Sequence, residues 1–352
     1  MTKHDITHGR LANQLLIKSR ALTPADVVAH LGGIQAQDYS GGEWSIGLRL
    51  PGSKLADIEK SISEGKIVRT WALRGTLHFL AGHDTRWMLD LLAPGIIAGL
   101  ARRYKELELD PATFGKTNSI LAGVLKGNKH LTRGELKAVI ERNGISCEGQ
   151  RMTFILHRAS LDKVICFGVT RDKQQTHSLF DETVPKSKPK EREEALAELA
   201  RRYFTSHGPA TLQDYMWWSG LSAADAKAGL QAVKSELEQV TIEGMAYWTP
   251  RDALPAKSKA PAVHLLPMFD SFLLGYKDRS ASIEPAVLGQ LRTGGMPHAT
   301  IMIDGRVVGK WNRTFRKDGV LVETSLFTKL RGQEKNVLSA SVKRYAEFIG
   351  KR

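Results

Sequence analysis

The sequence predicts an α+β fold, with helices before Pro261 and short strands after it. Two observations lead to this class. A helix start signal, a Thr followed three residues later by an acidic residue, recurs at Thr23, Thr132 and Thr211. Beyond Pro261 the apolar residues come in short runs separated by turn residues, which is typical of strands. An α-rich part therefore precedes a β-rich part.

Each start signal predicts a helix for a physical reason. The Thr hydroxyl accepts a hydrogen bond from an amide of the first turn, and the acid is favoured at the positive end of the helix dipole. Each signal is followed by a short amphipathic helix, a turn of small residues and a second helix. In the clearest copy the first helix runs from Thr211 to Trp218, and Ser222 caps the second. This is a helix-turn-helix pattern.

Strands follow two of these helix pairs. Residues 237–248 are predicted to form two strands joined at Glu243-Gly244, where a winged helix has its wing. The middle copy has a predicted helix at 151–160 and a strand at 164–167. We therefore predict tandem winged helix-turn-helix units. The alternative is a helical protein in which similar caps recur by chance. The predicted units cover residues 1–95, 96–185 and 191–250.

Residues 261–352 are predicted to form a C-terminal antiparallel β-barrel-like domain, closed by a helix at 334–349. Asp304-Gly305 is a favoured hairpin turn and joins two of the predicted strands. The apolar runs that predict strands are residues 263–266, 272–274, 299–303, 306–311 and 320–326. Proline- and lysine-rich linkers at 185–190 and 250–261 resist packing and separate the last units.

Composition points to a polyanionic partner. The 352-residue chain carries a formal net charge of +14, and nucleic acid is the commonest partner of such a protein, although the charge also serves simply to keep a protein dispersed. Its basic residues are spread along the chain, which suits a long binding track. No apolar run approaches the ~20 residues of a membrane span. An apolar signal core and a CxxC pair are both absent, so we expect a cytoplasmic protein.

Familiar catalytic motifs are missing from the sequence. It contains no HExxH metal motif, no Walker loop and no Gly-x-Ser-x-Gly element. Cys166 lies in an apolar run that is typical of a core rather than of a nucleophile. We therefore expect neither a metal nor a cofactor.

The most unusual segment is Gln35-Ala36-Gln37-Asp38, just beyond a predicted helix. Amides cannot titrate, so their possible chemistry is limited to orienting a water or presenting a dipole. Such a site is sufficient only for a bond that is already weak.

Two further segments place polar residues in apolar runs. Arg74, Thr76 and His78 alternate after Trp71 and are expected to share one strand face, where they either line a pocket or satisfy one another. For Asp270, in the segment 265–279, we favour an ion pair that ties the last domain to the others. Asp278 and Arg279 are given the same interpretation.

These segments, together with Gly309-Lys310-Trp311, resemble the AlkZ-like (YcaQ-like) winged-helix DNA glycosylases, in the same order and over nearly the whole chain. The resemblance implies tandem winged helices and a β-barrel around double-stranded DNA. It also implies excision of bulky or cross-linked N7-alkylated purines. We expect no cofactor and no obligate protein partner. Members carry Gln or Asp at the last motif position, and Gln37 is similar to the AlkZ-like group.

Carried over to this sequence, the resemblance implies that Gln35 and Gln37 are the catalytic pair. A purine alkylated at N7 is cationic and leaves as a neutral base, so amides that hold water near an oxocarbenium-like sugar are sufficient. Asp38 is a stronger base, but its adjacent position directs it elsewhere. No lysine is placed by a motif to form a Schiff base, so hydrolysis without strand cleavage is expected. The expected substrate and DNA contacts are Asp38, Trp71, Arg74, Thr76, His78, Lys310, Arg313 and Arg316.

Two other functions remain open at this stage. One is a winged-helix transcription regulator without catalytic activity. The other is an architectural protein that binds damaged and undamaged duplex alike.

Overall fold

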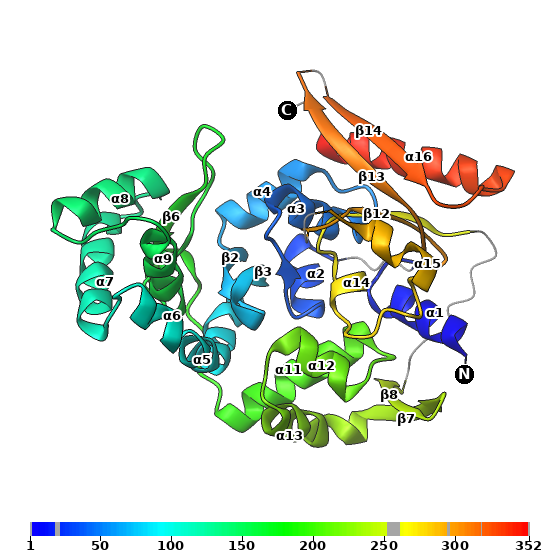
Figure 1. The fold of residues 1–352 in the computed structure, drawn as a ribbon, viewed down its shortest axis with the longest axis horizontal. Coiled ribbons are helices and arrows are strands. Elements are labelled where there is room, and N and C mark those ends of the chain that lie inside the picture. The colour runs from blue at the N-terminus through cyan, green and yellow to red at the C-terminus, as the bar shows by residue number, and fades with distance from the viewer. Residues whose placement is uncertain (1, 18–21, 252–260, 294–295, 318, 351–352) are drawn as a thin grey trace. The chain divides into compact units, whose positions relative to one another are not determined.

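The computed structural model describes residues 2–17, 22–251, 261–293, 296–317 and 319–350. It shows a mixed α/β fold in two compact units (Figure 1). The first unit combines Met1–Glu59 with Leu196–Arg352, and the second is Lys60–Ala195. No helix in the described part of the chain is long and apolar enough to cross a membrane.

The N-terminal part of the first unit is helical. Helix α2 begins with the predicted capping box, in which the Thr23 hydroxyl accepts from the Asp26 amide. Residues 41–48 of α3 are all buried, so this helix is a core element of the unit. The elements here are α1 (Lys3–Asn13), α2 (Pro24–His30), β1 (Ile34–Gln35), α3 (Tyr39–Leu48) and α4 (Leu55–Ser63), whose end lies in the second unit.

Three helices and a hairpin follow from residue 192. The Thr211–Asp214 capping box begins the second helix, Gly220 ends it with a φ of 75°, and Ser222 caps the third, all as predicted. The hairpin also forms as predicted, with a positive φ at both turn residues, Glu243 and Gly244. The elements are α11 (Arg192–His207), α12 (Leu212–Ser219), α13 (Ala223–Val233), η2 (Lys234–Glu236), β7 (Leu237–Ile242) and β8 (Met245–Pro250).

The C-terminal part contains an antiparallel sheet with the order β14-β13-β12-β9. The predicted turn at Asp304-Gly305 joins β12 to β13, and both residues have a positive φ. In the described residues the sheet is open, so a closed barrel is not confirmed. The elements are β9 (Val263–Leu266), α14 (Ser271–Leu274), α15 (Pro285–Leu288), η3 (Gly289–Leu291), β10 (Arg292–Thr293), β11 (Met296–Pro297), β12 (Thr300–Ile303), β13 (Arg306–Arg316), β14 (Gly319–Leu326) and α16 (Gly332–Ile349).

One expected strand in this region is wrong. Residues 272–274 form the helical turn α14, because the Asp270 carboxylate accepts from the Phe272 amide and starts a helix there. The linker at 185–190 contains neither helix nor strand, as its composition predicts. Most of the second linker lies outside the described residues.

The sheet is attached to α3 by tight packing within the first unit. The indole nitrogen of Trp44 donates to the Leu265 carbonyl at 2.7 Å. A Cβ at position 47 would lie 2.3 Å from the Phe348 ring, so only glycine allows α16 to approach α3 this closely. Arg344 on α16 donates to the carbonyls of Gly47 and Leu48 and so satisfies the end of α3.

A buried ion pair joins the same parts of the chain. The Arg49 guanidinium donates to both oxygens of Asp270 at 2.9 Å, and neither side chain is exposed. Ser45 donates to the carboxylate, and Gln14 accepts from Arg49 through its side-chain and backbone oxygens. Burial alone would raise the pKa of Asp270, but the charge of Arg49 and these hydrogen bonds lower it. The predicted tie through Asp270 is confirmed, whereas Asp278 accepts locally from Ser280.

A second buried pair fixes α12. Arg10 on α1 lies 3.7 Å from Asp214, donates to the Pro209 carbonyl and lies over the Tyr276 ring. Asp214 also accepts from the backbone amide of Lys277. Buried ion pairs therefore connect residues 1–59 to α12 and to the C-terminal part of the first unit, in addition to apolar packing.

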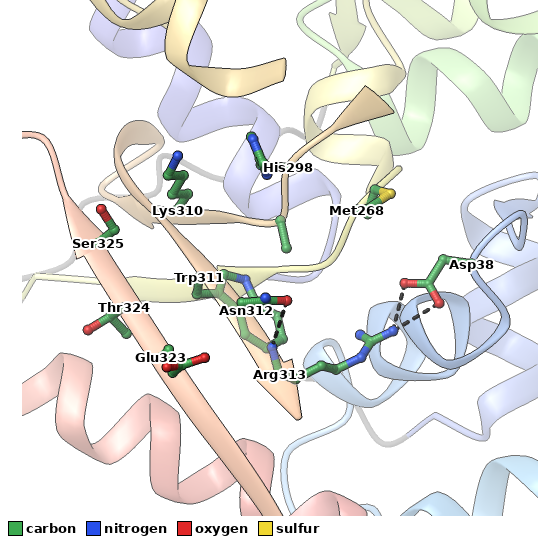
Figure 2. Close-up of a pocket in the computed structure, with 11 residues that line it drawn as sticks. Asp38, Met268, His298, Lys310, Trp311, Asn312, Arg313, Glu323, Thr324 and Ser325 are labelled. Atoms are coloured by element: carbon green, nitrogen blue, oxygen red, sulfur yellow. Dashed lines mark hydrogen bonds and ion pairs between the residues drawn. The ribbon is translucent and has the colours of Figure 1, made fainter. Parts of the chain in front are cut away.

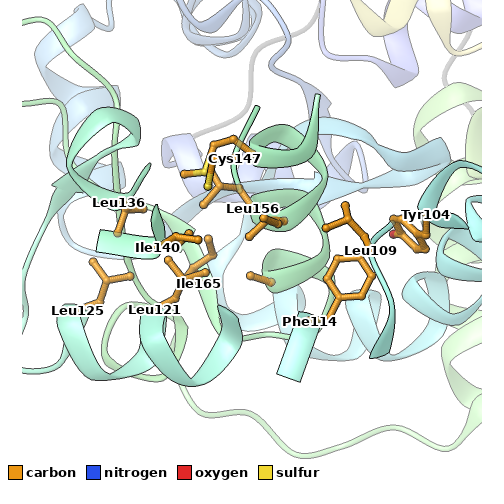
Figure 3. Close-up of a cluster of buried hydrophobic side chains, with 13 residues drawn as sticks. Tyr104, Leu109, Phe114, Leu121, Leu125, Leu136, Ile140, Cys147, Leu156 and Ile165 are labelled. Carbon is orange, nitrogen blue, oxygen red and sulfur yellow. The ribbon is translucent and has the colours of Figure 1, made fainter. Parts of the chain in front are cut away.

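The second unit contains its own apolar core, drawn in Figure 3. Helix α8 starts at the predicted Thr132–Glu135 capping box, and three short strands pair in the order β4-β6-β5. The elements are β2 (Ile67–Ala72), η1 (Leu73–Gly75), β3 (Thr76–Ala81), α5 (Gly82–Gly99), α6 (Ala101–Glu106), α7 (Pro111–Leu125), β4 (Leu131–Thr132), α8 (Arg133–Arg142), α9 (Arg151–Leu161), β5 (Ile165–Phe167), β6 (Thr176–Leu179) and α10 (Phe180–Thr183).

Loss of one partner of the central ion pair should be costly. We expect Asp270→Ala to lower the free energy of unfolding by about 3–5 kcal/mol, because it leaves the Arg49 charge buried and uncompensated. Replacing both residues, as Arg49→Met with Asp270→Leu, should recover much of that loss. Denaturant unfolding measures both. The matched control is Lys343→Ala, which breaks the exposed Lys343–Glu347 pair and should change stability by under about 1 kcal/mol. An Asp270→Ala loss no larger than the control's would contradict this.

Buried histidines should make the fold sensitive to acid. Burial lowers the pKa of His177 to about 3 from an ordinary 6.5, so the unfolded chain binds a proton that the folded chain does not. Above pH 6.5 this difference in proton binding does not reduce the free energy of unfolding. As the pH falls from 6.5 toward 3, the free energy of unfolding decreases by up to about 1.4 kcal/mol per pH unit. The thermal midpoint should fall between pH 6.5 and 4, and less steeply in His177→Gln. Equal slopes in the two proteins would contradict the assignment. Burial also lowers the pKa of His78, His157, His207 and His264.

Candidate active site

The Gln-x-Gln segment lies between α2 and α3, and its residues alternate between buried and accessible. Ile34 and Ala36 are fully buried, whereas Gln35 is partly exposed and Gln37 is exposed. This alternation is the one expected of extended chain. Both glutamines therefore have accessible surface, while Ala36 is packed in the core.

A glycine turn sets the direction of this stretch. Gly32 and Gly33, with φ of 68° and 125°, turn the chain after α2. A Cβ at Gly32 would lie 3.0 Å from the Trp218 ring. Conformation and packing therefore both require glycine at position 32.

Asp38 is held by an ion pair with the sheet. Arg313 Nη2 on β13 donates to both carboxylate oxygens, at 2.9 and 2.7 Å. The Asp38 side chain is 27% exposed and that of Arg313 15%. A Cβ at Gly41 would lie 2.5 Å from the carboxylate, so glycine provides the room that Asp38 occupies. Because Asp38 is committed to this pair, it is a poor candidate for a freely acting general base.

A pocket of about 470 Å³ lies beside this pair (Figure 2). Three of its lining residues, Asp38, Lys310 and Arg313, were expected from the sequence. Its other lining residues are Met268, His298, Ala299, Trp311, Asn312, Glu323, Thr324 and Ser325. Of these, Met268 and Trp311 lie within segments whose patterns are unusual, so a signal for them exists. The β14 residues enter the pocket only through the pairing of β13 with β14, which no local pattern reveals.

Arg316 is exposed near the end of β13, among apolar side chains that are also exposed. Phe315 beside it is 40% exposed, and Leu321 on β14 is 36% exposed. The Arg313 guanidinium lies 5.7 Å from the Phe315 ring centroid. This end of the hairpin therefore offers both positive charge and apolar surface.

In the second unit, the expected single strand face from Arg74 to His78 is wrong for Arg74. Arg74 lies in the turn η1 with a φ of 58°, and Gly75 follows with a φ of 70°, so the chain reverses there. Thr76 and His78 are on β3, where the Thr76 hydroxyl donates to the Leu73 carbonyl.

The His78 ring is buried and neutral. Its Nδ1 lies 3.0 Å from the Thr76 carbonyl, and only 2% of the residue is exposed. Burial, and then the nearby charge of Arg74, lower its pKa to about 3. His78 therefore does not act as an acid near neutral pH. Trp71 packs against Phe167 and His157, with ring centroids 5.2 and 5.4 Å away, so core packing accounts for its position.

Titrating nucleophiles and metal ligands are not assembled in the described part of the chain. No group of three or more His, Cys, Asp or Glu residues there could hold a metal ion. Both cysteines are buried and free, and burial raises the pKa of Cys166 to about 11. The polar groups of the pocket beside Asp38 are therefore the side chains of Lys310, Arg313, Asn312, Thr324 and Ser325, together with the His298 imidazole and the Glu323 carboxylate.

The fold and this amide pair define a mixed α/β protein whose candidate chemistry needs no titrating residue. The family model described as "DNA glycosylase AlkZ-like" matches residues 28–348, and the chain belongs to this family of DNA glycosylases, which are N-glycosyl hydrolases.

Two comparisons extend this finding. A protein of Streptomyces sahachiroi named "Interstrand DNA cross-link repair glycosylase" is 27% identical over 323 residues, which cover 86% of this chain and 85% of the relative. The solved structure of Streptomyces sahachiroi DNA glycosylase AlkZ has the same fold. Its TM-score is 0.80 at 23% identity, over 100% of this chain and 98% of that one.

The Asp38–Arg313 pair should contribute measurably to stability. We expect a double-mutant cycle of Asp38→Ala and Arg313→Ala to give a coupling of about 1 kcal/mol, since the pair is only partly exposed. Denaturant unfolding of the four proteins measures it. A parallel cycle on the exposed Lys343 and Glu347 pair should give under about 0.5 kcal/mol. Equal couplings in the two cycles would show that the Asp38 pair is no more than a surface contact.

Proposed function

We propose that this chain hydrolyses the N-glycosidic bond of bulky or cross-linked N7-alkylated purines in double-stranded DNA, without cleaving the strand. The observation that carries the proposal is that Gln35 is partly exposed and Gln37 exposed on either side of a fully buried Ala36, in a member of a DNA glycosylase family. The name of the Streptomyces sahachiroi relative, a cross-link repair glycosylase, supports this substrate class.

The amides would act on water and on the developing sugar charge. A water oxygen bonds to C1′ as the bond from C1′ to N9 breaks, and the bonding electrons pass to the purine and neutralise its positive charge. The leaving base needs no proton, and the proton lost by the water passes to solvent. An amide carbonyl can accept a hydrogen bond from the water and place its negative end near the oxocarbenium-like sugar. Neither task requires a pKa.

DNA contacts are proposed for residues of both units. Arg316, which is exposed and lies outside the pocket, would bind backbone phosphates, with an affinity that falls as salt rises. Lys310 and Arg313, which line the pocket, are proposed as contacts to the lesion. Asp38 would act by holding Arg313. In the second unit we retain Arg74 and Thr76 as candidate contacts. The partly buried Trp71 and the buried His78 would support them.

The architecture proposed for this function is a set of tandem winged helices. Support comes from residues 191–250, where α11, α12 and α13 precede the β7–β8 hairpin, and from residues 96–185, where α7, β4, α8 and α9 precede the paired strands β5 and β6, which are proposed as the wing. Residues 1–95 are proposed as the first copy and residues 261–352 as a barrel-like domain. A cytoplasmic location and the absence of an obligate protein partner are likewise proposals. The family assignment does not favour a regulator without catalytic activity.

Base release tests the proposed chemistry directly. We expect the protein to release base from duplexes that contain N7-methylguanine or a nitrogen-mustard cross-link. Gln35→Ala and Gln37→Ala should each slow release by about 10²-fold or more, because each removes an electrostatic contact to the transition state. Chromatography of the released base measures the rate. Thr328→Ala, at an exposed position outside the pocket, is the control.

Unchanged rates in both glutamine variants would remove the amides from the mechanism. Protection of a defined sequence on undamaged DNA, without any base release, would instead support a regulator.

A further inference from the structure

The pocket beside Asp38 is larger than a small lesion requires. Its volume of about 470 Å³ lies within the range of small-molecule sites. An N7-methyl group would leave nearly all of it empty. Asp38 directly follows Gln37 in the chain, so one wall of the pocket begins within about 4 Å of the amide motif, measured along the backbone.

The charges in the pocket do not suit a phosphate. Its cations, Lys310 and Arg313, are matched by two carboxylates, Asp38 and Glu323. One Arg313 nitrogen is committed to both oxygens of Asp38. A chain with a net charge of +14 therefore has a balanced pocket at this position, and a polyanion gains little there.

One wall of the pocket is backed by the almost fully buried ring of Trp311. Trp311 is only 4% exposed, its indole nitrogen donates to the Leu266 carbonyl at 2.8 Å, and its ring meets Tyr345 edge-on at 5.0 Å. These contacts fix the ring plane. Met268, with its flexible thioether, lines the same pocket and can adapt to an irregular ligand.

Hydrogen-bonding groups surround this apolar surface. Thr324 pairs with Trp311 across the strands, and Ser325 pairs with Lys310. Both hydroxyls are exposed and are able to donate or accept. The Asn312 side-chain oxygen accepts from the Arg313 amide, which leaves its NH₂ group available to a ligand.

We propose that this pocket is a subsite for the group appended to N7 of a bulky purine adduct, and that it selects uncharged appendages with a flat apolar face and hydrogen-bond acceptors. The proposal rests on the proposed function and deepens it. The subsite would recognise the appendage, while the Gln35 and Gln37 amides would act at the sugar. Selectivity between lesions is then separate from the chemistry that all of them share.

Filling the pocket tests this assignment. Thr324→Phe places a ring next to Trp311, and Thr328→Phe makes the same change at an exposed position outside the pocket. The probes are duplexes with a single N7-methylguanine, N7-benzylguanine or N7-(4-carboxybenzyl)guanine. Wild type should release the benzyl adduct faster than the carboxybenzyl adduct. The ratio of benzyl to methyl release should fall at least tenfold in Thr324→Phe and stay at the wild-type value in Thr328→Phe.

A binding assay keeps the result independent of catalysis. The same probes carry a 2′-fluorinated sugar, which slows cleavage by destabilising the oxocarbenium ion, and their affinities are measured by fluorescence anisotropy. Circular dichroism checks that each variant is folded.

Failure of the subsite and failure of the proposed function give different results. If bases are released and Thr324→Phe leaves the benzyl-to-methyl ratio unchanged, the subsite is overturned and the proposed function stands. If no base is released but wild type binds the benzyl probe at least tenfold more tightly than the methyl probe, and Thr324→Phe loses this preference, the function fails and the subsite stands. Equal binding of the three probes by wild type would overturn the subsite.

Discussion

The buried contact between Arg49 and Asp270 is the constraint on which the first unit depends. It joins the end of α3 to a loop of the C-terminal part, over 221 residues of sequence. A charge in this position is tolerable only if every partner is in place, because an unpaired buried ion costs several kcal/mol. Ser45, Gln14 and the Phe272 amide complete the network. Correct docking of the sheet against α3 is therefore specified, since a shifted arrangement would leave both charges unpaired.

The same network determines where the amide motif lies. Helix α3 begins directly after the Gln-x-Gln segment and is buried from Gly41 onward. Its start is tied to β13 by Asp38 and its end to the 270 loop by Arg49. The first tie is partly exposed and weak, whereas the second is fully buried. The position of the amides relative to the pocket thus rests mainly on the deeper pair and is refined by the outer one.

Local chemistry made much of the fold predictable. Thr23, Thr132 and Thr211 start helices because a capping hydroxyl and an acid three residues later satisfy the first turn whatever the tertiary context. The turns at Gly220 and Asp304-Gly305 follow from the same kind of local rule. The failures have tertiary or competing local causes. Asp270 starts a helix where the apolar run predicted a strand, and a positive φ at Arg74 interrupts what reads as one strand.

In the candidate site, too, some residues could be identified from local sequence and others only from tertiary contacts. Asp270 was identifiable because a carboxylate in an apolar run needs a partner, whereas the catalytic role of Gln35 and Gln37 stays a prediction. Glu323, Thr324 and Ser325 were not identifiable, since exposed polar residues on a strand are ordinary until the register with β13 is known. A search of the sequence for reactive histidines and cysteines would not have located the site either. Burial keeps His78 neutral and Cys166 protonated, so neither of these two groups is available for acid–base or nucleophilic chemistry near neutral pH.

The burial of His78 and Cys166 limits the reactions that the fold can support. An enzyme that must protonate its leaving group needs an acid with a pKa near the working pH, placed at that group, whereas the motif itself supplies two amides and an Asp38 carboxylate that is paired with Arg313. A leaving group that is already cationic removes this need. The remaining barrier lies at the sugar, where fixed dipoles act without gaining or losing a proton. Discrimination among lesions must then come from the part of the adduct that differs between them. The pocket beside Asp38, with its balanced charges, can provide that selectivity. Phosphate binding does not depend on this pocket, because exposed cations of β13 such as Arg316 can provide it.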